Sequence, residues 1–303
     1  MRIVVSGSSG LVGSAVVDYF NGQGDQITRL VRRDARGPAE IAWHPDGPPL
    51  EAARLEGFDA IVHLAGESLS DGRWNAAKKA RIRQSRVEGT QRLCQSLAGT
   101  NARPKVLVSA SAIGFYGNRG DELLDENSPS GTGFLADVCR EWEAATAPAA
   151  VAGLRVVCLR LGLVLSPRGG ALAKLLPVFR LGLGGPLGSG RQYMSWISLD
   201  DLVGVVDRVV RDEGIQGPVN AVSPHPVSNR EFARTLGRVL ARPAFFTVPA
   251  LVLRVAAGEM ADELFLSGAQ VVPRRLVDRG FTFRDAELRP ALARLLARSA
   301  IRE

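Results

Sequence analysis

The sequence is poor in the residues from which disulfide frameworks and zinc sites are built. Its 303 residues include only three cysteines and three histidines. Cys94, Cys139 and Cys158 are far apart in the chain, and the histidines lack the close spacing of metal ligands. We therefore expect no metal site, and we interpret the three cysteines as buried structural thiols.

Long apolar runs and blocks of like charge are also missing. No apolar stretch has the length of a membrane span, and the first residues lack the three regions of a signal peptide. The net charge of +7 is spread along the chain, which is not typical of a nucleic-acid-binding surface. We expect a cytoplasmic protein that binds a small-molecule substrate, and neither nucleic acid nor a membrane. The oligomeric state is not indicated.

The sequence does contain a regular alternation of apolar strands and helical patterns. Strands are predicted from Arg2 to the first glycine and at residues 26–31, 40–43, 60–64, 105–109 and 155–161. Helices are predicted at residues 74–97 and 131–151, and again from about Leu199 and Asn229. This order predicts an α/β fold, a Rossmann-type doubly wound and mostly parallel sheet with right-handed crossovers.

The last third of the sequence has a different character. Beyond Ser166 a glycine- and proline-rich stretch predicts loops, and from about Val248 helical patterns cover residues 249–258 and 288–297. We expect two domains. Residues 1–247 would form the nucleotide-binding domain with interspersed substrate-lobe loops, and residues 248–303 a small C-terminal cap.

Three glycines follow the first strand at intervals of three. Gly7, Gly10 and Gly13 stand between that strand and a helical pattern, the context in which such a triplet indicates a dinucleotide site. The first glycine allows the turn, the second lets a diphosphate approach the backbone, and the third allows the helix to pack on the sheet. The N–H groups at the helix start then bind the phosphates. The alternative is a tight turn without a ligand.

The end of the second strand bears on which dinucleotide is bound. An acidic residue there binds the ribose hydroxyls of NAD, whereas a basic residue pairs with the 2′-phosphate of NADP. The strand is followed by Arg32, Arg33 and Asp34, and a guanidinium matches a phosphate with two hydrogen bonds. The arginines favour NADP(H). Asp34 leaves NAD as an alternative.

Several short motifs elsewhere are shared with one protein family. They are HLAGE at 63–67, RW at 73–74 before Lys79, SR at 85–86, GT at 89–90, GGP at 184–186, SWI at 195–197, DD at 200–201, PRRL at 273–276 and GF at 280–281. With them the chain resembles the extended short-chain dehydrogenase/reductase superfamily, and within it the atypical "epimerase family" with a small C-terminal domain of unknown function. The resemblance implies a Rossmann fold, bound NADP(H), and a reductase or epimerase of unsettled substrate.

The resemblance also implies roles for particular residues. It assigns the diphosphate to Gly7, Ser9, Gly10, Leu11 and Val12, the 2′-phosphate to Arg32 with Arg33 as a neighbour, and the adenine-side ribose to Leu64, Ala65 and Gly66. It assigns the nicotinamide end to Ser109, Ser111, Arg160, Gly162 and Leu163.

Two departures from the family pattern concern catalysis. Phe134 and Val138 stand where extended members carry the catalytic Tyr and Lys, and neither side chain has a proton to give. Ser111 and Tyr116 are the candidate catalytic groups, because both follow the strand that ends at the cofactor. Tyr116 could instead be a packing residue. Glu67 and Lys79 are alternative proton donors, with a capping carboxylate and a solvated helix lysine as their structural interpretations.

A third departure concerns the substrate. Where sugar-nucleotide enzymes of this type carry a phosphate-binding Arg, the sequence has Met194, whose thioether cannot pair with phosphate. Arg191 lies nearby. Glu67, Gln192 and Trp196, with Ser195, are expected to line a pocket for a smaller and partly apolar ligand.

The sequence therefore predicts an NADP(H)-binding atypical short-chain reductase or epimerase that acts on a small carbonyl or sugar-like substrate. A non-catalytic protein that binds NADPH as a structural or redox-sensing ligand is one alternative, because the Tyr/Lys pair is missing. A nucleotide-sugar epimerase is the other.

Overall fold

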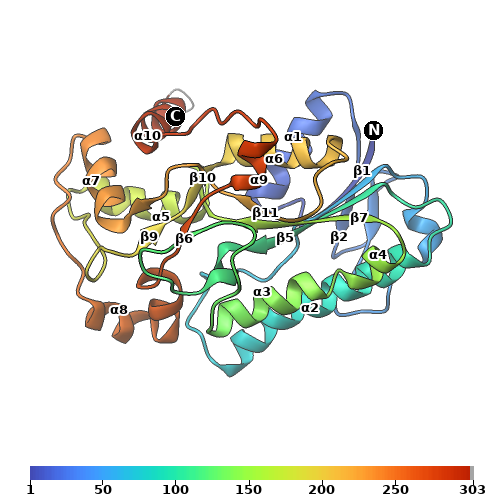
Figure 1. Ribbon diagram of the computed structural model, residues 1–303, viewed down its shortest axis with the longest axis horizontal. Coiled ribbons are helices and arrows are strands. Elements are labelled where there is room, and N and C mark those ends of the chain that lie inside the picture. Colours follow the sequence, from blue (N-terminus) through green and yellow to red (C-terminus); the bar gives the residue numbers. More distant parts are fainter. Residues whose placement is uncertain (301–303) are drawn as a thin grey trace. The chain divides into compact units, whose positions relative to one another are not determined.

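A computed structural model describes residues 1–300, and within them a seven-stranded sheet has the strand order β3-β2-β1-β4-β5-β7-β11 (Figure 1). The strands are β1 (Arg2–Ser6), β2 (Gln26–Val31), β3 (Glu40–Ala42), β4 (Ala60–His63), β5 (Val106–Ala112), β7 (Arg155–Leu161) and β11 (Gly217–Ala221). β1 pairs in parallel with both β2 and β4. The order reverses between β1 and β4, which is where doubly wound sheets bind their ligands. The predicted fold class is confirmed.

Helices cover both faces of this sheet (Figure 1). On one face lie α1 (Leu11–Gly22) and α6 (Leu199–Arg211), where the Arg211 guanidinium is 5.9 Å from the centre of the Phe20 ring. On the other lie α2 (Ala76–Ala98) and α3 (Phe134–Ala144), joined by an ion pair of 2.6 Å between Arg83 and Glu141. Buried aliphatic side chains such as Val4, Ile61, Leu93 and Leu107 fill the space beneath α2.

The chain divides into two compact units. The first contains residues 1–112, 137–160 and 203–219, and therefore most of the sheet. The second contains residues 113–136, 161–202 and the described residues from 220 on. The domain boundary predicted at residue 248 stays a prediction.

The second unit is built from short strand pairs and helices. Its strands are β6 (Leu123–Leu124), β8 (Leu163–Leu165), β9 (Tyr193–Met194), β10 (Trp196–Ser198), β12 (Val227–Ser228) and β13 (Gln270–Val271). Its helices are α5 (Gly170–Arg180), α7 (Asn229–Val239), α8 (Ala250–Ala257), the π-helical turn η3 (Ala261–Phe265), α9 (Arg274–Asp278) and α10 (Leu288–Ala300). Leu172, Phe179, Trp196, Phe232 and Leu292 belong to its core. Of the helices within residues 1–300, none combines the length and apolarity of a membrane span.

Two expectations from the sequence need correction. The stretch after Ser166, expected to be loop, includes helix α5, which buries Leu172, Leu176 and Phe179 on one face. Gly170 at its first position and Pro177 within it concealed this periodicity, since both residues weaken a helical pattern. The helix expected at residues 131–151 is divided into α3 and α4 (Ala147–Val151), with a proline in the first turn of α4.

The three cysteines are free and buried, as the sequence predicts. Burial raises the pKa of Cys94, Cys139 and Cys158 to about 12 each. Their thiols stay protonated near neutral pH and are poor nucleophiles.

Candidate functional site

The glycine loop lies between β1 and α1, and each of its glycines has a different environment. Gly7 has a positive φ of 65°, and a Cβ there would lie 2.7 Å from the Leu64 carbonyl carbon. A Cβ on Gly13 would lie 2.1 Å from the Gly7 oxygen. A Cβ on Gly10 would meet only the Gly7 oxygen, at 3.3 Å. Packing therefore requires glycine at the first and third positions, whereas Gly10 leaves a bare, exposed stretch of backbone.

The N-terminus of α1 offers that backbone to an anion. Gly10 is the N-cap residue, makes no side-chain capping bond, and is exposed together with Ser9. The first turn holds Leu11 and Val12 and has no acidic residue. First-turn N–H groups have no acceptor within their own helix and carry a partial positive charge. These features fit a diphosphate, and the predicted contacts of these residues with one stay a prediction.

The two arginines after β2 differ in what they bind. Arg33 donates to both carboxylate oxygens of Glu40 on β3, at 2.8 and 2.6 Å, and this holds the pKa of Glu40 at about 2. Arg32 is exposed, and no carboxylate within residues 1–300 pairs with it. The geometry leaves Arg32 available to a phosphate, while Arg33 has a partner already.

A buried polar network fixes the ends of β1 and β4. Ser6 Oγ accepts hydrogen bonds from the N–H groups of Leu64 (3.1 Å) and Ala65 (3.2 Å), so its own proton is directed to His63 Nδ1 at 2.7 Å. His63 Nε2–H then donates to Thr90 Oγ1 at 3.0 Å, which also accepts from Trp142 Nε1 at 2.9 Å. Burial lowers the pKa of His63 to about 4, so the ring is neutral. The network holds the backbone of residues 64–65 against Gly7.

Beyond β4, Glu67 lies among cations. Its Oε1 accepts from Lys78 Nζ at 2.8 Å, and Arg81 Nε lies 3.7 Å away. The hydrogen bond from Lys78 lowers the pKa of Glu67, so the group is a carboxylate near neutral pH and has no proton to give. Sequence reasoning named Lys79 and missed Lys78. The spacing was informative, since Lys78 precedes buried Ile82 by one helical turn.

At the end of β5, the two serines point into packed surroundings. Ser111 Oγ donates to Glu143 Oε1 at 2.8 Å, and the same carboxylate accepts from Arg160 Nε at 2.8 Å and Nη2 at 2.9 Å. Ser111 and Arg160 are 1% and 3% exposed. Ser109 is equally buried and donates to the Ala110 carbonyl oxygen at 3.3 Å. The predicted roles of these residues at the nicotinamide end stay predictions. Glu143 was not foreseen.

In the second unit, Tyr116 is completely buried. Its hydroxyl donates to Asn220 Oδ1 at 2.7 Å and lies 3.0 Å from the Asp125 carbonyl oxygen. Its ring makes an edge contact with Phe115. These contacts match the packing interpretation of Tyr116, and its role as a catalytic acid is untested.

The other residues predicted near the nicotinamide or the substrate also make packing contacts in the second unit. Trp196 is completely buried and donates from Nε1 to the His225 carbonyl oxygen. Gln192 donates from Nε2 to the carbonyl oxygens of Leu187 and Phe265. A Cβ on Gly162 would lie 2.6 Å from the Ser195 oxygen, and Leu163 N donates to that same oxygen at 2.8 Å. Met194 Sδ accepts from Asn229 Nδ2.

The start of α3, where the family pattern has its Tyr and Lys, is capped by a distant carboxylate. The N–H groups of Phe134 and Leu135 donate to Glu263 Oε1 (3.2 Å) and Oε2 (3.3 Å). Val138 is buried, 2% exposed. Glu263 is 129 residues from Phe134 in the chain, so no local pattern could have indicated it.

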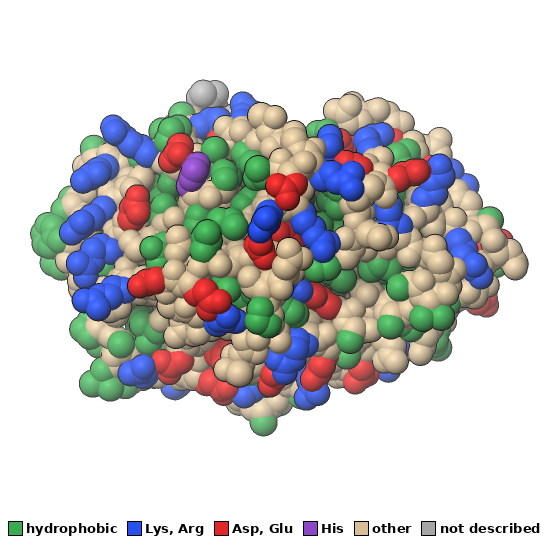
Figure 2. Space-filling model, in the orientation of Figure 1, with side chains coloured by type: hydrophobic (Ala, Val, Ile, Leu, Met, Phe, Trp, Pro, Cys, Tyr) green, Lys and Arg blue, Asp and Glu red, His purple; other side chains and the backbone are tan. Residues whose placement is uncertain are grey.

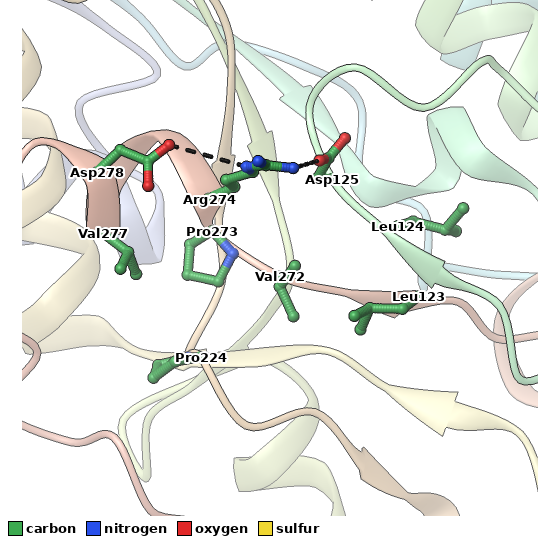
Figure 3. Close-up of a pocket in the computed structure, with 9 residues that line it drawn as sticks. All are labelled: Leu123, Leu124, Asp125, Pro224, Val272, Pro273, Arg274, Val277 and Asp278. Carbon is green, nitrogen blue, oxygen red and sulfur yellow. Dashed lines mark hydrogen bonds and ion pairs between the residues drawn. The ribbon is translucent and has the colours of Figure 1, made fainter.

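A pocket of about 510 Å³ also lies in the second unit (Figure 3). Its walls are mainly apolar, and its one cation, Arg274, pairs with Asp125 at 3.0 Å and with Asp278 at 3.8 Å. The lining residues are Leu123, Leu124, Asp125, Pro224, Val272, Pro273, Arg274, Val277 and Asp278. None of the predicted site residues is among them.

Comparison with models of known protein families shows the family of the chain. The model of the "NAD dependent epimerase/dehydratase family" matches residues 3–221, which include the glycine loop and, apart from Arg2, the whole seven-stranded sheet. The chain belongs to this epimerase/dehydratase family. A second model, a "Domain of unknown function (DUF1731)", matches residues 248–295. The resemblance inferred from the short motifs is thus confirmed.

Relatives of this epimerase/dehydratase chain include named proteins and solved structures. "Epimerase family protein Mb2239" of Mycobacterium bovis is 42% identical over 96% of each chain. A crystal structure of the human epimerase family protein SDR39U1 (isoform 2) with NADPH is similar with a TM-score of 0.90 and 33% identity, over 98% of this chain and 99% of that one. The nucleoside-diphosphate sugar epimerase of Corynebacterium glutamicum is similar with a TM-score of 0.81 and 39% identity, over 98% of this chain and 58% of that one.

Proposed function

We propose that the chain binds NADP(H) at the glycine loop, with the diphosphate at the N-terminus of α1 and the 2′-phosphate at Arg32. The observation that carries the proposal is the pairing of Arg33 with Glu40, which leaves Arg32 without a carboxylate. Arg32 follows β2, the parallel neighbour of the strand β1 that leads into the glycine loop. The human relative solved with NADPH supports it. When bound, the nicotinamide supplies a hydride at its C4 atom.

The reaction we propose is hydride transfer between this cofactor and the carbonyl carbon of a small substrate, in a reductase or an epimerase. The chain holds the cofactor through its glycine loop and Arg32. The carboxyl ends of β4 and β5 lie at the same edge of the parallel sheet as this loop. The proton for the carbonyl oxygen does not come from Phe134 or Val138, which have none to give.

A second candidate is a non-catalytic protein that binds NADPH. The hydroxyl groups expected to donate a proton to the substrate favour this candidate, because they already donate hydrogen bonds within the protein: Ser111 to Glu143 and Tyr116 to Asn220. The name of the Corynebacterium relative speaks for a third candidate, a nucleoside-diphosphate sugar epimerase. Met194 is evidence against this third candidate, because its thioether cannot bind the sugar diphosphate as an arginine would.

Consumption of NADPH distinguishes the reductase from the other candidates, because an epimerase returns the hydride to its substrate and a non-catalytic protein transfers none. The NADPH-saturated protein is mixed with aldehydes, ketones, quinones and sugar nucleotides in turn, and nicotinamide absorbance is followed. We expect at least one small carbonyl compound to consume NADPH well above the rate without protein. If none of the compounds does so, the reductase is excluded. Isomerisation of the sugar nucleotides in the presence of the oxidised cofactor, followed by NMR, then separates an epimerase from a non-catalytic protein.

The substitution Tyr116→Phe then tests whether the Tyr116 hydroxyl is the proton donor of the reaction. Loss of turnover with unchanged NADPH affinity would assign the proton to its hydroxyl. Retained turnover would leave that hydroxyl only its structural bond to Asn220.

A further inference from the structure

Hydrogen bonds from buried groups fix the walls of the pocket in the second unit. Strands β6 and β13 pair beside it, and Val272 N donates to the Leu124 carbonyl oxygen at 2.9 Å. The Val272 carbonyl oxygen accepts from Asn220 Nδ2 at 3.0 Å, and the Asp125 carbonyl oxygen lies 3.0 Å from the Tyr116 hydroxyl. The shape of the pocket is therefore set by the fold itself, as in most small-molecule sites.

Exposed apolar side chains line this pocket. Leu123 is 61% exposed and Val277 is 52% exposed, and Pro224, Val272 and Pro273 extend the apolar wall (Figure 3). Apolar surface that is continuous with a cavity is unfavourable in water and marks a binding site. The volume of about 510 Å³ lies within the range of sites for small molecules, about 300–1,000 Å³.

Charged side chains lie along one side of the pocket, and their charges do not balance. Figure 3 shows Arg274 between Asp125 and Asp278. Arg274 Nη1 donates to Asp125 Oδ2 at 3.0 Å, whereas Asp278 Oδ2 is 3.8 Å from Arg274 Nε, longer than a hydrogen bond. No other described side chain pairs with Asp278. The lining thus carries two negative charges and one positive charge, although the whole chain has a net charge of +7.

We propose that this pocket binds a small organic cation, a primary ammonium group attached to an apolar body. The ammonium group pairs with Asp278, and the apolar body lies against Leu123 and Val277. An anionic ligand would face two carboxylates, because the guanidinium of the lining is already bonded to Asp125. A neutral ligand of the same shape would gain the apolar contacts alone. This site goes beyond the proposed function, since it involves neither NADP(H) nor the carbonyl substrate.

Matched probes with the same alkyl chain test the charge and the apolar part of the ligand. Hexylamine, hexanol and hexanoate are titrated separately into the NADPH-saturated full chain, near neutral pH and at constant ionic strength, and binding is followed by ligand-observed NMR. We expect saturable binding of hexylamine, tighter than the binding of hexanol or hexanoate. Butylamine should bind more weakly than hexylamine, by up to about fourfold for each buried CH₂ group that it lacks.

Two substitutions locate the binding at Asp278, whose side chain is 67% exposed and therefore tolerates replacement. Asp278→Asn should weaken hexylamine binding about two- to fivefold, the range of an exposed ion pair, with little change for hexanol. Asp278→Lys reverses the charge and should make hexanoate bind more tightly than hexylamine. Asp262→Asn is the matched control, because Asp262 is also exposed and pairs with Arg254 but does not line the pocket. It should bind hexylamine as the wild type does.

The proposal is overturned if hexylamine does not bind saturably to the wild type. It is also overturned if hexanoate binds to the wild type more tightly than hexylamine, since Arg274 would then be the group that faces the ligand. Unchanged hexylamine affinity in Asp278→Asn, or an equal loss in Asp262→Asn, would place the amine elsewhere and overturn it too. The same titrations without NADPH keep the test independent of the proposed function.

Discussion

At the scale of single residues, the three loop glycines are required for different physical reasons. Gly7 and Gly13 are in contact with backbone atoms, and a methyl group at either position would overlap them. A Cβ on Gly10 would have only the Gly7 oxygen within 4 Å. Stability therefore depends on the outer two glycines, and ligand binding on the middle one.

Two substitutions separate these roles. Gly13→Ala should lower the free energy of unfolding by about 1–3 kcal/mol, the usual cost of overpacking, because its Cβ would be 2.1 Å from the Gly7 oxygen. Gly10→Ala should change stability by less than about 1 kcal/mol but weaken NADPH binding at least about tenfold, since the methyl group blocks the diphosphate. Urea unfolding and NADPH titration measure both quantities. Wild-type NADPH affinity in Gly10→Ala would contradict this account of the loop.

The sequence predicts the loop because its signal is local, but it cannot predict the surroundings of Ser111 and Tyr116. Ser111 bonds to a carboxylate 32 residues away, and Tyr116 to an amide 104 residues away. Such partners are set by the packing of whole elements, and a single sequence carries no direct sign of them. The same holds for Glu143, which neutralises Arg160.

At the scale of elements, the His63 network joins β1, β4, α2 and α3 through side chains alone. The Ser6 hydroxyl proton has an acceptor on the His63 ring only when the imidazole is neutral. A second proton, on Nδ1, would face a hydroxyl oxygen that already accepts two N–H groups. Acid should therefore loosen these four elements together.

The network makes stability depend on pH. The pKa of His63 is about 4 in the folded chain, below the ordinary value of 6.5. Between pH 6.5 and pH 4, His63 is therefore protonated in the unfolded chain but neutral in the folded chain. Stability should fall by about 1.4 kcal/mol per pH unit across this window, about 3 kcal/mol in all, and the loss should level off below the folded pKa.

Urea unfolding at a series of pH values measures this slope. His63→Gln should remove the part of the pH dependence of stability that His63 causes. His44→Gln, at an exposed position, should leave the pH dependence unchanged. An identical pH dependence in wild type and His63→Gln would show that His63 is not the group responsible.

The predicted bounds of helices and strands agree best with the structure where the apolar pattern is strong and turn or capping residues mark the ends of the element. β2 and β7 have the predicted residues, and α6 and α7 begin at the predicted Leu199 and Asn229. Ser228 caps α7 by accepting from Glu231 N, a signal that is visible in the sequence. The short strands of the second unit have two or three residues each, too few for a period to be recognised.

At the scale of the whole molecule, the groups proposed to bind the cofactor phosphates and the adenine-side ribose come from the first unit. The glycine loop, Arg32 and residues 64–66 lie within residues 1–112. The surface charge is mixed, and Figure 2 shows acidic and basic side chains interspersed over most of the visible face. Basic side chains gather at the edge where Figure 1 draws α7, which exposes Arg230, Arg234 and Arg238 one turn apart.

The central claim is that Arg32 selects NADPH over NADH, and titration with both cofactors tests it most directly. Nicotinamide fluorescence at moderate salt is followed for the wild type, Arg32→Ala and Arg33→Ala. The wild type should prefer NADPH, and Arg32→Ala should lose about ten- to a hundredfold in NADPH affinity, the value of one charge-assisted hydrogen bond, with little change for NADH. Arg33→Ala should keep the preference, because Arg33 is paired with Glu40. Equal affinity of the wild type for both cofactors, or an equal loss of both in Arg32→Ala, would contradict the claim.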